Sequence, residues 1–248
     1  MKLQNTVFMA VLLALAAYQA SASTTITNGD FASGDFMPGW IKTGNAQVQG
    51  TAAVQSNNFG HIPPPAVNHA ILGTGTVGAD LLGGSAVPAS ALENFSGLTG
   101  GTLLANNQIN CPTCTVGSGS AIQTIFTAAA GSQLSFNWNF FTNTDPRNVP
   151  QDMAFWVLDH DFHFLANTHS TLVYSDTASF ETNYQNSFTA LTSGLHTLSF
   201  GIVDGTPGGS ALALTNVQLN AVPLPAACWL FLMGIVGLFK YSRQFKRA

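Results

Sequence analysis

The sequence has few charged residues, and basic residues are almost confined to its ends. Charged residues make up 7% of the 248-residue chain, against about a quarter in an ordinary soluble protein. All eleven acidic residues lie between Asp30 and Asp204, where Lys42 and Arg147 are the only basic residues. With two basic residues against eleven acidic ones, this stretch has a net charge of about −9, which repels nucleic acid and anionic lipid. The same charge attracts divalent cations.

Cysteine is also scarce, with three residues in the chain. Cys228 lies in the apolar C-terminal stretch, whereas Cys111 and Cys114 form a lone Cys-Pro-Thr-Cys. A zinc site needs two further ligands, and a thioredoxin-type site needs a βαβ context. Haem attachment needs a histidine directly after the second cysteine, where Thr115 stands. In an oxidising compartment we therefore predict a disulfide between Cys111 and Cys114.

Residues with a catalytic pattern are missing. The chain has two glutamates, Glu93 and Glu181, and neither a Gly-x-Ser-x-Gly elbow nor a His-Glu-x-x-His motif. A glycosidase needs two facing carboxylates, and no spacing among the aspartates selects such a pair. No Lys-Ser or Lys-Thr follows the glycine-rich segments, as a phosphate-binding loop requires. We therefore predict that the protein is not an enzyme.

The N-terminus reads as a secretory signal peptide, residues 1–22. Lys2 precedes an apolar run over residues 7–17, which is too short to span a membrane comfortably. Ala20 and Ala22 then form a small-x-small cleavage site for signal peptidase. The predicted mature protein begins at Ser23 and is exported.

The C-terminal stretch, residues 222–248, has three parts. It begins with a proline motif, continues with an uncharged run over residues 226–239, and ends with four basic residues. Prolines two apart hold the entry segment extended. With the flanking residues the apolar run becomes long enough to span a bilayer. Since basic residues stay cytoplasmic, we expect a transmembrane helix with its C-terminus inside. The motif residues are Val222, Pro223, Leu224, Pro225 and Ala226.

This tail resembles the PEP-CTERM family of bacterial sorting signals, in its Val-Pro-Leu-Pro-Ala variant. The resemblance covers about a tenth of the chain, including Trp229, Gly234, Gly237 and the basic end. It implies recognition of the proline motif by a membrane protease of the exosortase type and removal of the tail. It also implies delivery to the surface or extracellular matrix of a Gram-negative bacterium, after anchoring in the inner membrane. The alternative is an ordinary C-terminal membrane anchor.

Residues 23–221 are predicted to form one all-β domain. Residues 133–140 alternate strictly, with apolar Leu134, Phe136, Trp138 and Phe140 on one face. Strands spaced 8–12 residues apart with turns between them predict an antiparallel β-sandwich, and a jelly roll is favoured. The further predicted strands are residues 46–49, 68–72, 121–127, 152–158, 162–165, 171–174, 184–191, 195–204 and 210–219. A short helix is predicted over residues 90–98, with Ser90 as its N-cap.

The start of this domain has an Asn-Gly-x-Phe pattern followed by Gly39-Trp40. It resembles the first strand and loop of jelly-roll domains of the carbohydrate-binding-module type. The residues near the end of the domain resemble a jelly-roll domain that recurs with this tail. That group usually has Asp-Asn-Val where this chain has Thr215-Asn216-Val217, which puts a structural calcium site in doubt. The alternative for Phe31 and Trp40 is that they close the sandwich core.

Two polar clusters are candidate metal sites. Asn143, Asp145 and Asp152 surround a loop after the aromatic strand, and such oxygen ligands suit Ca²⁺. In the segment from Asp159 to His163, the side chains of Asp159, Asp161 and His163 share one strand face, so a divalent cation is conceivable there. The alternative for this second cluster is a solvated hairpin turn.

One aromatic side chain is a candidate ligand platform. Trp156 follows Phe155, so one of the two is expected to point away from the core. An outward Trp156 is a flat surface for a sugar ring, although a position between the sheets is the alternative. Two functions stay open: a structural or exopolysaccharide-interacting role in the matrix, and a carbohydrate-binding module with a glycan site that uses calcium.

Overall fold

The computed structural model describes residues 25–49, 54–56, 60–62, 68–75, 85–109, 111–142, 151–170, 173–174, 184–188, 191–205 and 209–220. The signal-cleavage residues Ala20 and Ala22, the sorting motif at residues 222–226 and the tail helix lie outside this part. So do Asn143 and Asp145 of the predicted calcium site. These remain predictions. Among the described residues, no helix is long and apolar enough to cross a membrane.

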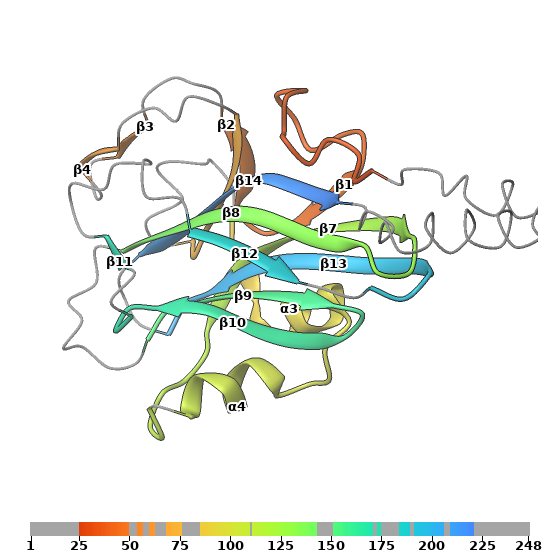
Figure 1. The fold of residues 1–248 in the computed structure, drawn as a ribbon. Helices are drawn as coiled ribbons and strands as arrows, with labels where there is room; N and C mark the ends of the chain where they lie inside the picture. Colours follow the sequence, from red (N-terminus) through yellow and green to blue (C-terminus); the bar gives the residue numbers. More distant parts are fainter. Residues whose placement is uncertain are drawn as a thin grey trace, which may run out of the picture.

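Two sheets pack face to face (Figure 1). The first sheet is antiparallel throughout and contains, in spatial order, β1 (Trp40–Thr43), β7 (Ser118–Ala128), β13 (Gly194–Val203), β9 (Met153–Leu158) and β10 (Asp161–Asn167). A sixth strand, β6 (Val87–Pro88), also pairs with β7. The predicted strands over residues 121–127 and 195–204 are confirmed. The hairpin predicted from residues 152–165 is confirmed too, as β9 and β10.

The second sheet faces the first and carries the strict alternation noted in the sequence. Its order is β11 (Val173–Tyr174), β8 (Gln133–Thr142), β14 (Ser210–Asn220), β5 (His69–Gly73) and β2 (Ala46–Gln49). β12 (Tyr184–Phe188) also pairs with β8, and β3 (Val54–Ser56) with β4 (Gly60–Ile62) forms a separate hairpin. One contact, between β11 and β8, is parallel. The predicted all-β architecture of two antiparallel sheets is confirmed.

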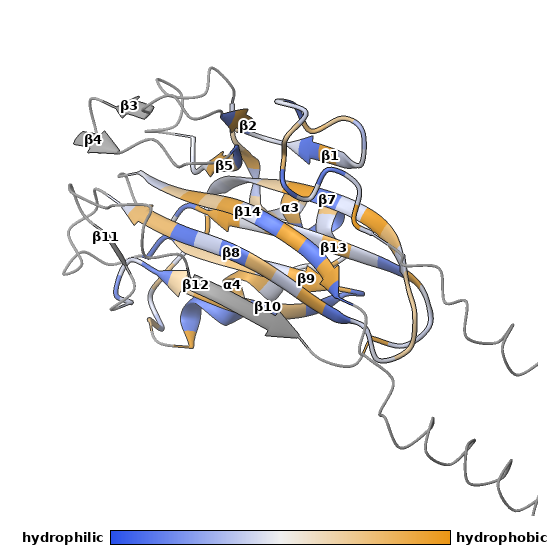
Figure 2. Cartoon of the chain, turned by 45° about the horizontal axis from the view of Figure 1, so that its top comes forward, coloured by the Kyte–Doolittle hydropathy of each residue, from blue (hydrophilic) through white to orange (hydrophobic). Residues whose placement is uncertain are grey.

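The main core lies between the sheets and is aromatic. Hydrophobic and polar residues alternate along β8 and β14 (Figure 2), and the alternating apolar side chains of β8 are buried. Phe136 makes edge-to-face contacts with Trp156 and Phe200, at centroid distances of 5.4 Å and 4.7 Å. Burying one such side chain stabilises the fold by about 1.5–3 kcal/mol.

The chain closes this core at its N-terminal side with two aromatic residues. Phe31 and Trp40 are 0% and 1% exposed, and their rings lie 5.5 Å apart. The Trp40 indole N–H donates to the carbonyl of Asn28 at 3.1 Å. Phe31 and Trp40 therefore close the core, which is the alternative reading of this segment.

Two short helices, α3 (Ala89–Ser96) and α4 (Thr102–Gln108), lie against the outer face of the first sheet (Figure 1). They form a second apolar cluster, in which Leu92 and Leu103 pack with Met153, Phe155 and Val157 of β9. β9 is therefore covered on both faces and all six of its residues are buried. This explains its continuous apolar sequence.

The helical cover overturns one sequence prediction. Trp156 is 4% exposed and faces the core between the sheets, while Phe155 is 0% exposed and faces the helices. Neither ring points into solvent, so the hypothesis of Trp156 as an outward sugar platform is wrong. The predicted helix exists as α3, but it starts at Ala89 after Pro88 and has no side-chain cap. Ser90 is therefore not its N-cap.

Candidate functional site

The position of α4 is set by a buried carboxylate on α3. Glu93 is 5% exposed, and its two carboxylate oxygens accept the backbone N–H groups of Gly101 at 2.9 Å and Leu103 at 2.8 Å. The first N–H groups of a helix have no partner within the helix, and a carboxylate there also opposes the helix dipole favourably. One acidic side chain therefore joins the middle of α3 to the start of α4.

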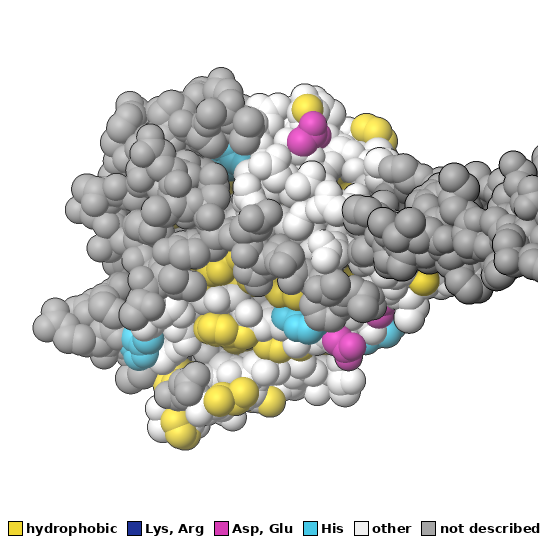
Figure 3. Space-filling view, in the orientation of Figure 1, with side chains coloured by type: hydrophobic (Ala, Val, Ile, Leu, Met, Phe, Trp, Pro, Cys, Tyr) yellow, Lys and Arg dark blue, Asp and Glu magenta, His cyan; other side chains and the backbone are white. Residues whose placement is uncertain are grey.

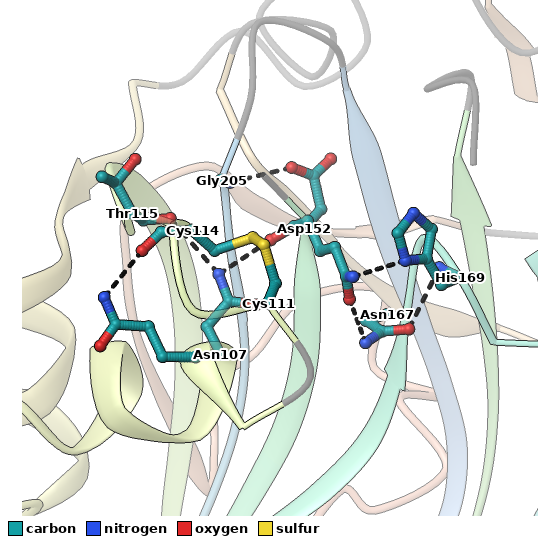
Figure 4. Close-up of a disulfide and its surroundings, with 10 residues drawn as sticks. Asn107, Cys111, Cys114, Thr115, Asp152, Asn167, His169 and Gly205 are labelled. Carbon is teal, nitrogen blue, oxygen red and sulfur yellow. Dashed lines mark hydrogen bonds between the residues drawn. A yellow bond between two sulfur atoms is a disulfide. The ribbon is translucent and has the colours of Figure 1, made fainter. Parts of the chain in front are cut away.

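The chain after α4 is held by the predicted cysteine pair. Cys111 and Cys114 form a disulfide, and both are buried (Figure 4). The Gln108 side-chain amide donates to the carbonyl of Cys114 at 3.0 Å. The disulfide loop is therefore fastened to the last turn of α4.

Asn107 on α4 has a fixed amide orientation (Figure 4). Its Nδ2 donates to the carbonyls of Thr115 at 3.3 Å and Gln151 at 3.1 Å. Because a carbonyl only accepts, the nitrogen must be the atom that faces them. Asn107 Oδ1 is then left buried without a hydrogen-bond partner in the described structure. Such an acceptor costs about 1–3 kcal/mol while unpaired.

Beside Asn107, a polar network fixes the open end of the β9–β10 hairpin (Figure 4). The Asn167 side-chain amide donates to Gln151 Oε1, and Gln151 Nε2 lies 2.5 Å from Nδ1 of His169. Asn167 Oδ1 in turn accepts the backbone N–H of His169 and the hydroxyl of Ser170, both at 3.1 Å. These residues form a rigid support beside the disulfide.

Between α4 and β10 lies a small hollow that we call the α4–β10 groove. Its volume is about 220 Å³, and its lining comprises Asn106, Asn107, Ile109, Met153, Phe164 and Asn167. Phe164 is 47% exposed and Ile109 is 72% exposed. Hydrophobic side chains gather over α4 on this face of the molecule (Figure 3). The groove thus combines an exposed aromatic ring, aliphatic walls and amides, and none of the described residues that line it is charged.

A larger hollow, of about 470 Å³, lies between residues 25–30 and residues 216–219. The described part of its lining contains no aromatic side chain. It also adjoins the points where the described chain begins and ends. We therefore do not treat it as the binding site.

Asp152, from the predicted calcium site, has an internal role in the described structure. It is fully buried. Its Oδ1 accepts the N–H of Gly205 at 3.0 Å, and its Oδ2 accepts the hydroxyl of Ser210 at 2.5 Å. It therefore ties the start of β9 to the loop before β14. Among the described residues, no three His, Cys, Asp or Glu side chains come together as a metal site, and the calcium hypothesis stays a prediction.

The second polar cluster forms a tight hairpin turn between β9 and β10. Asp159 and His160 both have positive φ, at 50° and 79°, as the favoured two-residue hairpin turn requires. Asp159 Oδ1 accepts the N–H of Thr197 at 2.9 Å, and Nδ1 of His160 lies 2.8 Å from the carbonyl of Gly97. The turn is thus bonded to β13 and to the end of α3. Asp159, His160 and Asp161 are exposed, so the solvated hairpin turn given as the alternative is confirmed.

His196 completes this turn. Its Nδ1 lies 2.5 Å from Asp159 Oδ2, and its Nε2 lies 3.0 Å from the carbonyl of Thr192. Burial lowers the pKa of His196, but the hydrogen bonds to Asp159 and Thr192 and the charge of Asp159 together raise the pKa above its ordinary value. With both ring nitrogens facing acceptors, His196 favours its protonated form. It holds the turn and has no nitrogen left to act as a base.

His163 stacks on an aromatic side chain of the neighbouring strand β9. Its ring lies against Trp156 with the centroids 4.1 Å apart. Burial lowers the pKa of His163, and the nearby Asp161 opposes that shift only partly. Asp159 is engaged with His196 and His163 with Trp156. The structure therefore does not bring Asp159, Asp161 and His163 together as a metal site.

The sequence did not point to the residues of the α4–β10 groove. The stretch over residues 102–108 is short and weakly amphipathic, and neither Asn106 nor Phe164 belongs to a recognisable motif. The only available signal in the sequence was Glu93, one of the two glutamates of the chain, which lies in the predicted helix over residues 90–98. Its role as a cap for a second helix depends on tertiary structure.

The sequence matches no family model and no curated protein. Among solved structures, the carbohydrate-binding module TmCBM61 in complex with beta-1,4-galactotriose is 9% identical. The match covers 79% of this chain and 97% of that chain, with a TM-score of 0.39.

Two further structures are similar at the same low level. A family 35 carbohydrate-binding module from Clostridium thermocellum is 10% identical over 72% of this chain and 92% of that chain, with a TM-score of 0.28. The enzymatically active domain of tailspike protein 4 of bacteriophage CBA120 is 13% identical over 79% of this chain and 21% of that chain, with a TM-score of 0.35. Because all these TM-scores lie below 0.5, the function proposed below rests on the groove of this chain.

Proposed function

We propose that this protein is an exported, non-catalytic glycan-binding protein that binds a sugar residue in the α4–β10 groove. One observation carries the proposal: among the described residues, an exposed aromatic ring, apolar side chains and asparagine amides line a hollow, and none of these side chains is charged. Binding sites for small molecules are mostly apolar, with a few placed polar groups. A sugar ring matches this lining, because it has apolar C–H faces and a rim of hydroxyl groups.

The groove residues take distinct parts in this binding. The exposed face of Phe164 packs on the C–H face of the sugar, while the exposed side chain of Ile109 covers its edge. The half-buried amide of Asn106 forms hydrogen bonds with hydroxyl groups of the sugar. Glu93, the disulfide and the network around Gln151 keep these side chains in place before the ligand arrives, which lowers the entropic cost of binding.

The remaining parts of the proposal concern the ends of the chain and the finer fold. The motif from Val222 to Ala226 supports recognition by an exosortase-type protease, with delivery to the cell surface or matrix. The transfer of successive strands between the sheets, as from β7 to β8 and from β13 to β14, supports a jelly-roll arrangement. A calcium ion near Asp152 remains part of the proposal, together with Asn143 and Asp145.

Affinity electrophoresis on a panel of soluble polysaccharides tests the glycan-binding function. The comparison is between the wild-type protein, Phe164→Ala and the control Leu195→Ala, which removes another exposed apolar side chain, 72% exposed on β13. We expect retention by at least one polysaccharide, weakened about tenfold or more by Phe164→Ala and less than about twofold by Leu195→Ala. Retention by no polysaccharide contradicts the function and favours a purely structural matrix role. Loss of retention in EDTA identifies calcium as part of the site.

A further inference from the structure

We infer that the disulfide between Cys111 and Cys114 is a latch, and that the α4–β10 groove binds its ligand only when this disulfide has formed. The inference rests on the proposed function and concerns the regulation of the same site. It follows from the position of the disulfide, directly behind the helix that supplies one wall of the groove. Because thiols stay reduced in the cytoplasm and pair in oxidising compartments, the groove is completed only after export.

The two walls of the groove differ in how they are held. Three of the described lining residues lie on β9 and β10, which pair with each other, and β9 also pairs with β13. The other three, Asn106, Asn107 and Ile109, lie on α4 or directly after it. The sheet fixes the first wall whether or not the disulfide is present, whereas the second wall depends on the position of α4.

α4 is too short to be stable by itself. It has seven residues, and isolated helices shorter than about 12 residues are marginal in water. Within this helix, only Leu103 and Asn107 are buried, so packing fixes it at few points. Glu93 holds its first turn through the N–H groups of Gly101 and Leu103. The last turn, which carries the groove residues, needs an anchor of its own.

That anchor is the chain around the disulfide (Figure 4). The side-chain amide of Gln108 donates to the carbonyl of Cys114 at 3.0 Å, and that of Asn107 donates to the carbonyl of Thr115 at 3.3 Å. The backbone N–H of Cys114 donates to the carbonyl of Cys111 at 2.9 Å. Both carbonyls that receive α4 therefore belong to a bridged cysteine or to the residue after it, and the disulfide keeps them within reach of the helix.

Beyond Thr115 the chain is fixed to the first sheet. The N–H of Gly117 donates to the carbonyl of Asp204 at 2.7 Å, directly before β7 begins. The disulfide thus connects this fixed point to the last turn of α4. One contact of α4 is independent of it, since Asn107 also donates to the carbonyl of Gln151 at 3.1 Å. We therefore expect reduction to loosen the last turn of α4 without detaching the helix from the sheet.

Formation of the latch is a two-electron oxidation. The thiols of Cys111 and Cys114 lose two protons and two electrons and form one S–S bond. A disulfide-bonded oxidant, such as oxidised glutathione, takes up the protons and electrons and leaves as two thiols. In the folded protein the cysteines are 3% and 0% exposed, so a reductant reaches them only when this region opens. The latch therefore forms as the chain folds, and it persists afterwards.

The test compares the oxidised full-length chain with the double variant Cys111→Ala/Cys114→Ala, both carrying Cys228→Ser to remove the remaining thiol. We expect the double variant to bind the polysaccharide that the oxidised protein binds best at least about tenfold more weakly. Amide hydrogen exchange should be faster in α4 and unchanged in β9. Because the disulfide joins residues only three apart, its loss should lower Tm by less than about 10 °C and leave unfolding cooperative.

A redox cycle supplies the matched control. Oxidised protein that is unfolded, reduced with dithiothreitol and refolded under reduction should bind as weakly as the double variant. Reoxidation with oxidised glutathione should restore its binding. The same cycle should leave the double variant unchanged, because it has no thiols to exchange.

Each way in which the inference can fail has its own signature. A double variant or reduced protein that binds within about twofold of the oxidised protein would overturn the latch and leave the glycan-binding function intact. Loss of cooperative unfolding would make the disulfide a support of the whole fold, and would also overturn the latch. If the oxidised protein binds no polysaccharide, the proposed function is wrong. Hydrogen exchange then decides the latch by itself, and equal exchange of α4 in both proteins would overturn it.

Discussion

The two ends of the β9–β10 hairpin differ in how completely their polar groups are paired. At the turn, the Asp159 carboxylate and both nitrogens of His196 have partners. At the open end, beside α4, the buried oxygen of Asn107 has none in the described structure. The turn is the denser polar cluster in the sequence, with Asp159, His160, Asp161 and His163 in five residues.

This difference shows that the density of polar residues is a poor guide to a binding site. A group that is already hydrogen-bonded inside the protein gains little from a ligand, whereas an unpaired one gains the whole interaction. The turn therefore stabilises the fold, and the groove is the part prepared for a ligand. The predictions below separate these two ends.

The largest effect on stability should come from removing a core side chain in the strands that connect the two ends of the hairpin. Trp156→Ala deletes a 4% exposed side chain that contacts Phe136 and His163. We expect a loss of about 3–5 kcal/mol in the free energy of unfolding, as for other buried aromatic residues, measured by urea denaturation. Phe164→Ala is the matched control and should cost less than about 1 kcal/mol, because its ring is half-exposed. Similar losses for the two variants would contradict the assignment of Trp156 to the core.

A smaller effect should come from Glu93, which acts at the groove end. Glu93→Ala leaves the N–H groups of Gly101 and Leu103 without their acceptor. We expect a loss of about 1–3 kcal/mol, with faster amide hydrogen exchange in α4 and weaker glycan binding. Glu93→Gln keeps one acceptor oxygen and should fall between wild type and Glu93→Ala. Unchanged exchange in α4 would show that the helix is held by other contacts.

At the turn, Asp159→Asn should change stability alone. The amide tolerates the positive φ of this position, but it loses the charged contact with His196. We expect a loss of about 0.5–1.5 kcal/mol, with a glycan dissociation constant within about twofold of wild type. Thermal unfolding measures the change in stability, and calorimetric titration of the folded protein with glycan measures the dissociation constant. A clear loss of affinity would place the turn in the binding site.

The smallest effect should be a pH dependence that belongs to the turn. Because the pKa of His196 is raised in the folded protein, its protonated form stabilises the fold. This contribution is complete below the ordinary histidine pKa of about 6.5, and it is lost as the pH rises through the folded-state pKa. The stability difference between wild type and His196→Gln should therefore shrink from pH 5.5 to pH 8.5. His163, whose pKa is lowered by burial, has the opposite dependence, and it cancels because both proteins contain it.

A constant difference between wild type and His196→Gln across this pH range would mean that His196 is neutral in the fold. Asp159→Asn/His196→Gln is the control for this measurement. Once both partners are gone, the pH-dependent difference should be absent.

The parts of the fold that could be predicted from the sequence are those with a local signal. Strict alternation identified β8, because one face of that strand meets the core and the other does not. The continuous apolar run in β9 was read as half-exposed, because nothing local shows that helices cover the second face of the sheet. The sequence therefore left open whether Trp156 faces solvent or lies between the sheets.

The candidate site was not predictable for the same reason. Asn106, Asn107 and Phe164 come from a helix and a strand that only the tertiary fold brings together, and their value depends on amide orientation. The orientation of the Asn107 amide is set by the carbonyl of Thr115, 8 residues along the chain, and by that of Gln151, 44 residues along the chain. The disulfide between Cys111 and Cys114 had a local signal, since its two cysteines are three residues apart.

The most direct test of the central claim is a titration followed by NMR. The mature protein, labelled with ¹⁵N, is titrated with the oligosaccharide that it binds best, and the side-chain amide signals of Asn106 and Asn107 are compared with the ring signals of His160 and His196. We predict that the two asparagine signals shift in a saturable way, with the same dissociation constant, while the histidine signals stay in place. Shifts at the histidines with unchanged asparagine signals would contradict the account, and would move the binding site to the other end of the hairpin.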